Sequence, residues 1–210
     1  MAVALFDKYA KTYHDKYMNV DLYAESLDFL CNAIPLDSKV ADIACGPGNI
    51  SGYLLNKRQD LDLLGIDLSP KMVELAKALN PKAEFKVMDA RQIYSLNSGY
   101  NAVIAGFLFP YLSKEEVFKI ISDAFSILEK EGLLYISTVE DDYEKSGIQI
   151  SSSGEDSLYM HFYNEGILTW AFIEAGFTIL YTGHIKYIDT KGNPVTDLIM
   201  IAKKGKNHRK

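Results

Sequence analysis

The stretch Val40-Ala41-Asp42-Ile43-Ala44-Cys45-Gly46-Pro47-Gly48-Asn49 decides how this chain folds. In it, an apolar run that ends in an acid is followed by a turn with two glycines and then by a segment with helical character. Glycines in such a turn let the backbone approach a nucleotide-like ligand closely. A second acid, Asp67, closes the next apolar run at about the distance, roughly 20 residues, where a ribose-binding carboxylate is expected. The stretch therefore predicts both a sheet-based fold and a cofactor.

Short apolar runs alternate with helical patterns from about residue 38 onward. Runs that are almost continuously apolar and rich in Val, Ile and Leu are typical of strands buried on both faces of a parallel sheet. The alternation therefore predicts an α/β fold with a doubly wound, mostly parallel sheet. The expected strands are Val40–Ala44, Leu61–Ile66, Ala83–Met88, Ala102–Gly106 and Leu133–Val139.

Helix and turn signals separate these runs. Ser69-Pro70 places a hydroxyl at a helix N-cap and proline at the first helical position, and Ser113 forms a capping box with Glu116. A helix over about Asn164–Ala175 is stopped by Gly176. Two β-like runs follow and flank a turn-rich segment, which predicts an antiparallel hairpin. These runs, Phe177–Tyr187 and Val195–Ala202, complete an expected sheet of seven strands.

The two ends of the chain differ from its middle. Residues 3–34 read as two helices, so we expect an N-terminal helical cap or lid over residues 1–37 and a Rossmann-like domain over residues 38–203. A basic, disordered tail is expected over residues 204–210. Residues 140–158 are polar and are expected to form a long mobile or substrate-facing loop. Leu5, Phe6, Tyr9, Tyr13 and Tyr17 cluster in the first helix.

Charge and composition restrict the function. The chain has 210 residues and a net charge of −6, but its last eight residues hold five of the 22 basic side chains. The body is left with 17 basic against 28 acidic residues, a net charge of −11, which would repel phosphate backbones and predicts no nucleic-acid partner. Cys31 and Cys45 do not suit a disulfide framework, and no stretch approaches the roughly 20 apolar residues that span a bilayer. We therefore expect a cytoplasmic monomer or homodimer without a membrane partner.

Four elements occur in the order that one enzyme family uses. They are the turn Asp42–Gly48, the strand end Gly65-Ile66-Asp67-Leu68, the helix start Ser69-Pro70-Lys71-Met72 and the pair Asp89-Ala90. With them the chain resembles the class I S-adenosylmethionine-dependent methyltransferases of small-molecule type, over about residues 38–202. The fourth strand of that family often starts with Asp, where this chain has Asn101. The resemblance implies S-adenosyl-L-methionine as cofactor and S-adenosyl-L-homocysteine as product.

The resemblance also assigns positions in the cofactor site. It implies that Asp67 binds the ribose hydroxyls, that Met72 lies near adenine and that Asp89 holds the adenine edge. Met72 as an ordinary core residue and Asp89 as a solvated carboxylate stay open as alternatives. A dinucleotide is disfavoured because Ser51 stands where its motif needs a third glycine. The expected cofactor-binding residues are Tyr13, Asp42, Ala44, Cys45, Gly46, Gly48, Asn49, Asp67, Leu68, Met72, Asp89, Ala90 and Phe107.

Methyl transfer from a sulfonium requires alignment of nucleophile, methyl and sulfur and the exclusion of water. In the family, the segment equivalent to Phe107–Tyr111 lies beside the acceptor, so Tyr111 is one candidate catalytic residue. His161 is the other, because imidazole titrates near neutral pH, although a packed histidine is the alternative. No metal is expected, because the histidines and cysteines lack zinc spacing and no acid directly follows the fourth strand.

The acceptor is predicted to be a small molecule. Phe109-Pro110-Tyr111 has only one proline and lacks the leading polar residue found in amino methyltransferases of nucleic acids. Neither cysteine is placed like the nucleophile of cytosine-C5 enzymes. Two other functions stay open, namely a catalytically silent cofactor-binding scaffold of the same fold and a nucleic-acid methyltransferase that needs a partner.

Overall fold

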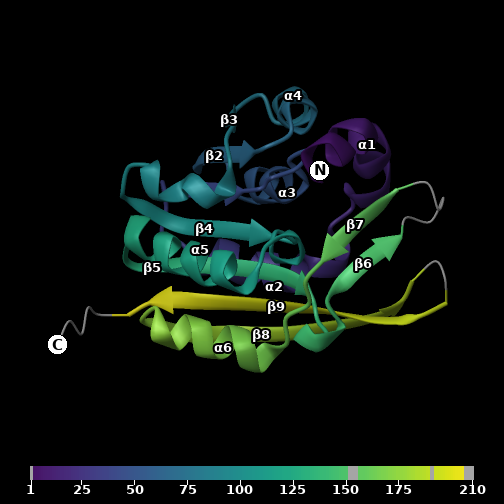
Figure 1. The fold of residues 1–210 in the computed structure, drawn as a ribbon. Coiled ribbons are helices and arrows are strands. Elements are labelled where there is room, and N and C mark those ends of the chain that lie inside the picture. The colour runs from purple at the N-terminus through teal and green to yellow at the C-terminus, as the bar shows by residue number, and fades with distance from the viewer. Residues whose placement is uncertain (1, 151–155, 190–191, 206–210) are drawn as a thin grey trace.

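The computed structural model describes residues 2–150, 156–189 and 192–205, and a twisted sheet forms its centre (Figure 1). Among these residues, seven strands of that sheet lie in the order β3-β2-β1-β4-β5-β9-β8. The first five strands are parallel, whereas β9 is antiparallel to β5 and to β8. The predicted mostly parallel sheet with a C-terminal hairpin is therefore confirmed. The strands are β1 (Lys39–Ile43), β2 (Asp62–Asp67), β3 (Glu84–Val87), β4 (Tyr100–Gly106), β5 (Leu128–Val139), β8 (Phe177–Ile188) and β9 (Pro194–Lys204).

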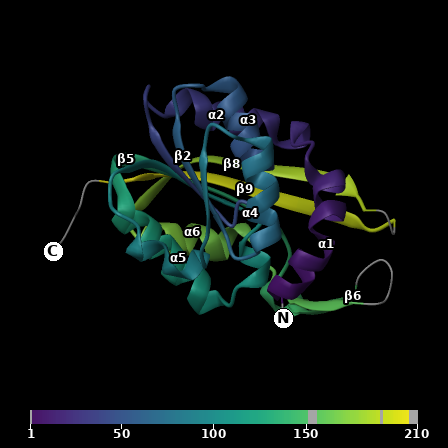
Figure 2. The same cartoon turned by 90° about the horizontal axis from the view of Figure 1, so that it is seen from above.

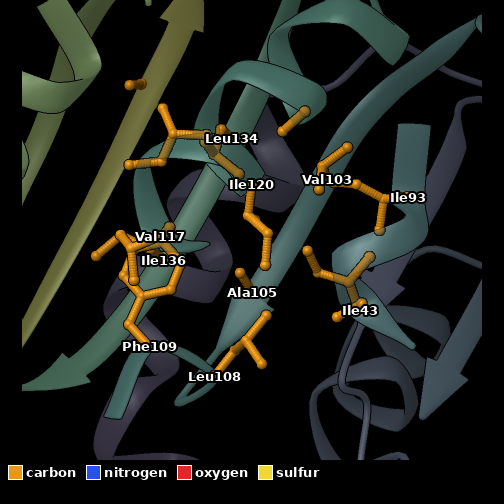
Figure 3. Packing of buried hydrophobic residues seen from close by; sticks show 14 of the residues in the cluster. Ile43, Ile93, Val103, Ala105, Leu108, Phe109, Val117, Ile120, Leu134 and Ile136 are labelled. Atoms are coloured by element: carbon orange, nitrogen blue, oxygen red, sulfur yellow. The ribbon is translucent and has the colours of Figure 1, made fainter. Parts of the chain in front are cut away.

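Helices cover both faces of the sheet, as Figure 2 shows from above. Buried side chains of α2 (Ala24–Ala33), α3 (Asn49–Lys57) and α4 (Pro70–Leu79) form the core on one face. The other face packs on α5 (Lys114–Ile127) and α6 (Glu165–Glu174). Figure 3 shows this second core, where Ile120 of α5 lies among strand side chains such as Val103 and Leu134. Because successive strand residues point to opposite faces, Val40 belongs to the first core and Ala41 to the second.

The first helix stands outside these two layers. It is α1 (Ala2–Tyr17), and it lies beside α4 (Figure 2). The side chains of residues 2–4, 14, 16 and 17 lie outside the described part of the chain, and with them the predicted place of Tyr17 in the aromatic cluster. No helix in the described ranges combines the length and the apolar character that crossing a membrane requires. Short helical turns are η1 (Asp21–Tyr23), η2 (Ala90–Ser95), η3 (Phe109–Tyr111) and η4 (Tyr143–Lys145).

The predicted start and stop signals are confirmed in detail. The Ser69 side chain accepts a hydrogen bond from the backbone N–H of Met72 at the start of α4, and Ser113 and Glu116 form the capping box of α5. Gly176 follows α6 with φ of 94°, which is costly for any other residue. Asn101, which stands where the family often has Asp, has a structural role. Its Oδ1 accepts from the backbone N–H of Lys39 at 2.9 Å and so joins β4 to the start of β1.

Two predicted boundaries are wrong. Residues 140–158 are not one loop, because β6 (Gly147–Ile150) and β7 (Ser157–Met160) pair antiparallel there. The polar composition did not indicate these strands, because β6 and β7 pair with each other and are not buried in the main sheet. The predicted tail begins too early, because Lys204 still belongs to β9 and its Nζ donates to the carbonyl of Leu128 at 2.6 Å. The predicted disorder of residues 206–210 lies outside the described residues.

Arg58, the C-cap residue of α3, fixes the end of α2 to the end of α3. Its guanidinium donates to the carbonyl oxygens of Cys31 at 2.6 Å and of Pro35 at 2.6 Å, where α2 ends. The same group forms an ion pair with Asp60 at 2.6 Å. Terminal helix carbonyls need partners of this kind, and a planar guanidinium can reach several of them at once.

We expect Arg58→Ala to lower the free energy of unfolding by about 2 kcal/mol, because it leaves the last carbonyls of α2 without these donors. Urea unfolding followed by circular dichroism measures the loss. Lys57→Ala is the matched control, because the contacts of Lys57 with Asp28 and the Tyr53 ring lie on an exposed surface and their loss should change stability little. An equal loss in the two variants would contradict the role assigned to Arg58.

Candidate functional site

A pocket of about 300 Å³ opens where the carboxyl ends of β2, β1 and β4 meet, and α1 covers it. Open α/β sheets bind their ligands at this edge. Most of the predicted cofactor residues lie on the pocket, together with Tyr111. The lining residues are Phe6, Tyr13, Ala44, Gly46, Asp67, Leu68, Ser69, Met72, Asp89, Ala90, Arg91, Gly106, Phe107, Leu108, Tyr111 and Leu112.

The two glycines of the turn after β1 serve different purposes. Gly46 has φ of 54° and Gly48 has φ of 81°, both in the left-handed region. A Cβ at Gly46 would have the Tyr13 ring, 3.9 Å away, as its nearest neighbour, so glycine keeps this part of the pocket empty. A Cβ at Gly48 would lie 2.6 Å from Nδ2 of Asn80, so glycine there lets α4 pack against the start of α3. Only Gly46 therefore makes room for a ligand.

Asp67 connects the glycine turn to the start of α4. Its Oδ2 accepts from the backbone N–H of Gly46 at 2.9 Å, and its Oδ1 accepts from the N–H of Ser69 at 2.8 Å. Burial raises the pKa of Asp67, and these backbone hydrogen bonds oppose the shift by favouring the carboxylate. The carboxylate thus sits on the pocket in one fixed orientation, with further lone pairs able to accept from a ligand.

Four predicted cofactor residues are not on the pocket lining, namely Asp42, Cys45, Gly48 and Asn49. Asp42 is 1% exposed, and its Oδ2 accepts from the Ser51 hydroxyl at 2.6 Å. Burial raises the pKa of Asp42 to about 7, although the Ser51 hydrogen bond acts in the opposite direction. Burial also raises the pKa of the Cys45 thiol. Contact between these four residues and a cofactor stays a prediction.

Asp89 is on the pocket, but an arginine already holds it. Its Oδ1 accepts from the backbone N–H of Arg91 at 2.9 Å, and the Arg91 guanidinium pairs with its Oδ2 at 2.6 Å. Arg91 lowers the pKa of Asp89, and it also pairs with Glu116 at 3.0 Å. Sequence reasoning missed Arg91 as a pocket residue, because an arginine two residues after an N-cap aspartate looks like any surface arginine. Met72 lines the pocket and is also buried, so both of its predicted roles agree with its position.

The end of the pocket at β4 is aromatic. We call Phe6 and Tyr13 of α1, with Phe107 and Tyr111 after β4, the aromatic end. The rings of Phe6 and Tyr111 meet edge to face with centroids 5.0 Å apart, and those of Phe6 and Tyr13 are 6.1 Å apart. These contacts join the covering helix to the loop that follows β4.

Phe107 is held in an unusual backbone conformation. Its φ is 52°, and its N–H donates to the carbonyl of Ser137 in β5 at 2.8 Å. The Tyr23 ring packs against it with centroids 5.4 Å apart, and the Tyr23 hydroxyl donates to the buried Asp197 carboxylate at 2.7 Å. A left-handed bulky residue persists only where its surroundings fix it, as they do at many functional sites.

Side chains hold α1 over the pocket at two places. The Asp7 carboxylate accepts from the hydroxyl of Ser69 and from the backbone N–H of Lys71, the latter at 3.3 Å, at the N-terminus of α4. A negative side chain is favourable there. Farther out, Lys8 donates to Asp156 at 2.9 Å and the Tyr9 hydroxyl donates to the same carboxylate. The covering helix therefore depends on both α4 and the segment before β7.

His161 is not on the pocket lining. Its backbone N–H donates to the carbonyl of Pro110 at 2.8 Å, and its ring lies beside those of Tyr159 and Tyr143, with centroids 4.9 and 5.9 Å away. It therefore supports the loop that carries Tyr111, and catalysis by its imidazole stays a prediction. In the described ranges, no group of three or more His, Cys, Asp and Glu side chains is arranged to hold a metal ion.

Comparison with known proteins identifies related sequences. Residues 40–132 match the family model described as a methyltransferase domain. A putative methyltransferase of Invertebrate iridescent virus 6 is 30% identical over 129 residues, which cover 61% of this chain and 45% of that protein. A carboxy-S-adenosyl-L-methionine synthase of Nautilia profundicola is 30% identical over 142 residues, which cover 63% of this chain and 60% of the relative. The chain thus spans about half the length of the curated relatives it matches.

Solved structures share the fold over most of the chain. A SAM-dependent methyltransferase from Methanosarcina mazei has a TM-score of 0.73 and 21% identity, over 85% of this chain and 98% of that one. The 1,6-didemethyltoxoflavin-N1-methyltransferase of Burkholderia thailandensis, solved with 1,6-didemethyltoxoflavin and S-adenosylhomocysteine, has a TM-score of 0.70 and 18% identity, over 98% and 89% of the two chains. The predicted class I methyltransferase fold and the resemblance to that family are confirmed.

Asp42→Asn should flatten the pH dependence of stability. Burial raises the pKa of Asp42 from its ordinary 3.8 to about 7, so the native state holds the proton more tightly than the unfolded chain does. Stability should therefore fall as the pH rises from about 4 to about 7, by at most about 4 kcal/mol from this residue. Asparagine has no such proton to lose and can still accept from Ser51.

Urea unfolding at a series of pH values between 4 and 8 measures this effect. The stability of the variant relative to the parent should increase with pH. Asp62→Asn, at an exposed position of β2, is the control and should run parallel to the parent protein. Parallel curves for Asp42→Asn as well would show that Asp42 does not titrate as inferred.

Proposed function

We propose that this chain, a protein with the class I methyltransferase fold, binds S-adenosyl-L-methionine in the pocket at β2, β1 and β4 and transfers its methyl group to a small-molecule acceptor. S-adenosyl-L-homocysteine is the proposed product. Asp67 is the observation that carries the proposal. It stands at the tip of β2, oriented by the N–H groups of Gly46 and Ser69, in the position from which a carboxylate accepts hydrogen bonds from ribose hydroxyls.

The pocket fits a cofactor with a sulfonium and an ammonium group but no phosphate. Gly46 leaves space at the turn, and the carboxylates of Asp67 and Asp89 face the pocket. Among the described lining residues the single cation is Arg91, which already pairs with Asp89 and with Glu116. A pyrophosphate, or the extra carboxylate in the product named for the Nautilia relative, would therefore lack an unpaired cation here.

In the proposed reaction, the protein orients the cofactor and the acceptor and encloses them in the pocket. When bound, the cofactor supplies a methyl group that its positive sulfur already activates for in-line displacement. Phe6 and Tyr13 cover the pocket from α1 and so reduce the access of water on that side. We assign contact with the acceptor to Tyr111, which lies on the pocket at the aromatic end. His161 acts indirectly, by holding Pro110 and with it the loop of Tyr111.

A small acceptor suits the size and the cover of this pocket. The pocket of about 300 Å³ lies beneath Phe6 and Tyr13 of α1, and this helix limits the approach of a polymer from its side. One structural relative, aligned with 98% of this chain, was solved with 1,6-didemethyltoxoflavin bound. The free, buried thiols of Cys31 and Cys45 also suit a reducing compartment, so the proposal includes a cytoplasmic location.

Asp67→Asn should weaken S-adenosyl-L-homocysteine binding roughly 10- to 100-fold in calorimetry, because an amide replaces an acceptor-only carboxylate that also orders the turn. Asp62→Asn, near the opposite end of the same strand, is the matched control and should bind like the parent protein. If the parent protein gives no saturable heat with S-adenosyl-L-homocysteine or S-adenosyl-L-methionine, the proposed function is wrong.

Transfer itself is tested with cofactor that carries a tritiated methyl group. The protein is incubated with separate small-molecule, RNA and protein fractions of a cell extract, and the label in each is counted. We expect label in the small-molecule fraction, and its loss with Asp67→Asn. Label in RNA would instead favour a nucleic-acid methyltransferase, and binding without any transfer would favour a silent scaffold.

A further inference from the structure

The two ends of the pocket differ in chemistry. Among the lining residues that the structure describes, the charged side chains are Asp67, Asp89 and Arg91, and all three follow β2 or β3. On the other side of β1, the lining that follows β4 is aromatic and apolar. Two further carboxylates near the pocket already have partners: Asp42 is buried against Ser51, and Asp7 of α1 accepts from Ser69 and Lys71 at the start of α4. A site that binds a cation ordinarily has carboxylate side chains, whereas the lining of the aromatic end has aromatic rings in their place.

The order of the strands tells which part of the cofactor meets these rings. This step rests on the proposed function, in which Asp67 holds the ribose at the β2 end. In S-adenosyl-L-methionine the sulfonium is attached to the ribose, on the side away from the base. With the base toward Asp89 after β3, the sulfur lies across β1, toward β4. It then stands near Phe6, Tyr13, Phe107 and Tyr111.

We propose that these four rings recognise the positive charge of the sulfonium and so distinguish the cofactor from its neutral product. Aromatic rings attract cations through their quadrupole, and loss of water around the pair strengthens the attraction. Transfer of the methyl group removes this charge and leaves a thioether. Product affinity therefore lacks the contribution of the rings, which favours release of S-adenosyl-L-homocysteine after each turnover.

The test compares the dissociation constants of S-adenosyl-L-methionine and S-adenosyl-L-homocysteine in calorimetry. In Phe6→Leu and in Tyr111→Leu we expect binding of the charged cofactor to weaken by about tenfold, a free energy of about 1.4 kcal/mol, with less than a twofold change for the product. Tyr111→Phe keeps the ring and should keep the ratio of the two constants. Phe118→Leu, whose ring packs against Trp170 far from the pocket, is the control for loss of an aromatic side chain.

Parallel weakening of both ligands in the leucine variants, or no change in either, would overturn the proposal, because it would show that the rings only pack. Absence of binding of both ligands to the parent protein would refute the proposed function, and this inference with it. A second measurement uses only the parent protein, so its result does not depend on whether the variants fold. The analogue in which a carbon bearing a protonated amine replaces the sulfonium should bind as tightly as the cofactor at pH 7, whereas affinity no better than that of the product would contradict the proposal.

Discussion

The Asp67 carboxylate is the contact on which the rest of the site depends. It receives the N–H of Gly46 on one oxygen and the N–H of Ser69 on the other, so it joins the turn after β1 to the turn after β2. The hydrogen-bond ladder of the sheet does not fix the conformation of either turn, because both turns lie beyond the ends of their strands. A charged acceptor makes these bonds stronger than neutral ones and sets the spacing between the two turns. The floor of the pocket is thereby fixed before any ligand arrives.

The roof of the pocket is attached to the same place. Ser69 accepts from the N–H of Met72 as the cap of α4, and its hydroxyl donates to Asp7 of α1. Ser69 therefore caps α4 through Met72, bonds to Asp67 on the floor of the pocket and bonds to Asp7 of the covering helix. The aromatic contact of Phe6 with Tyr111 attaches the roof on the β4 side as well, in addition to the bonds of Lys8 and Tyr9 to Asp156. Together these contacts explain how a helix outside both core layers still takes a defined position.

Local signals sufficed for most of the fold, and the reasons are visible in single residues. Ser69, Ser113 and Gly176 act within one helical turn, so their sequence context determines their structure. The apolar runs predicted the strands, because burial on both faces demands such composition. The pair of β6 and β7 was missed because neither strand is buried, and each is defined only by its partner. Such long-range pairing leaves no local pattern.

The site was predictable to the extent that backbone motifs define it. The sequence placed Gly46, Asp67 and Asp89 on one pocket, because the ends of parallel strands must meet at one edge. It could not show that Asp42 is sealed by Ser51, since an acid at a strand tip has the same context whether it faces the pocket or the core. Nor could it predict that Arg91 neutralises Asp89, because that contact depends on Glu116 from α5 as well.

The connection between β5 and α6 has a consequence for how relatives of this chain could diverge. The Asp156 carboxylate links it to the roof, and the bond from His161 to Pro110 links its backbone to the loop after β4. Its described residues, 140–150 and 156–162, lie outside the central sheet. This segment can therefore be lengthened, shortened or exchanged in evolution without disturbing the strands that form the pocket. The surroundings of the pocket and the stability of the sheet can in that sense change separately.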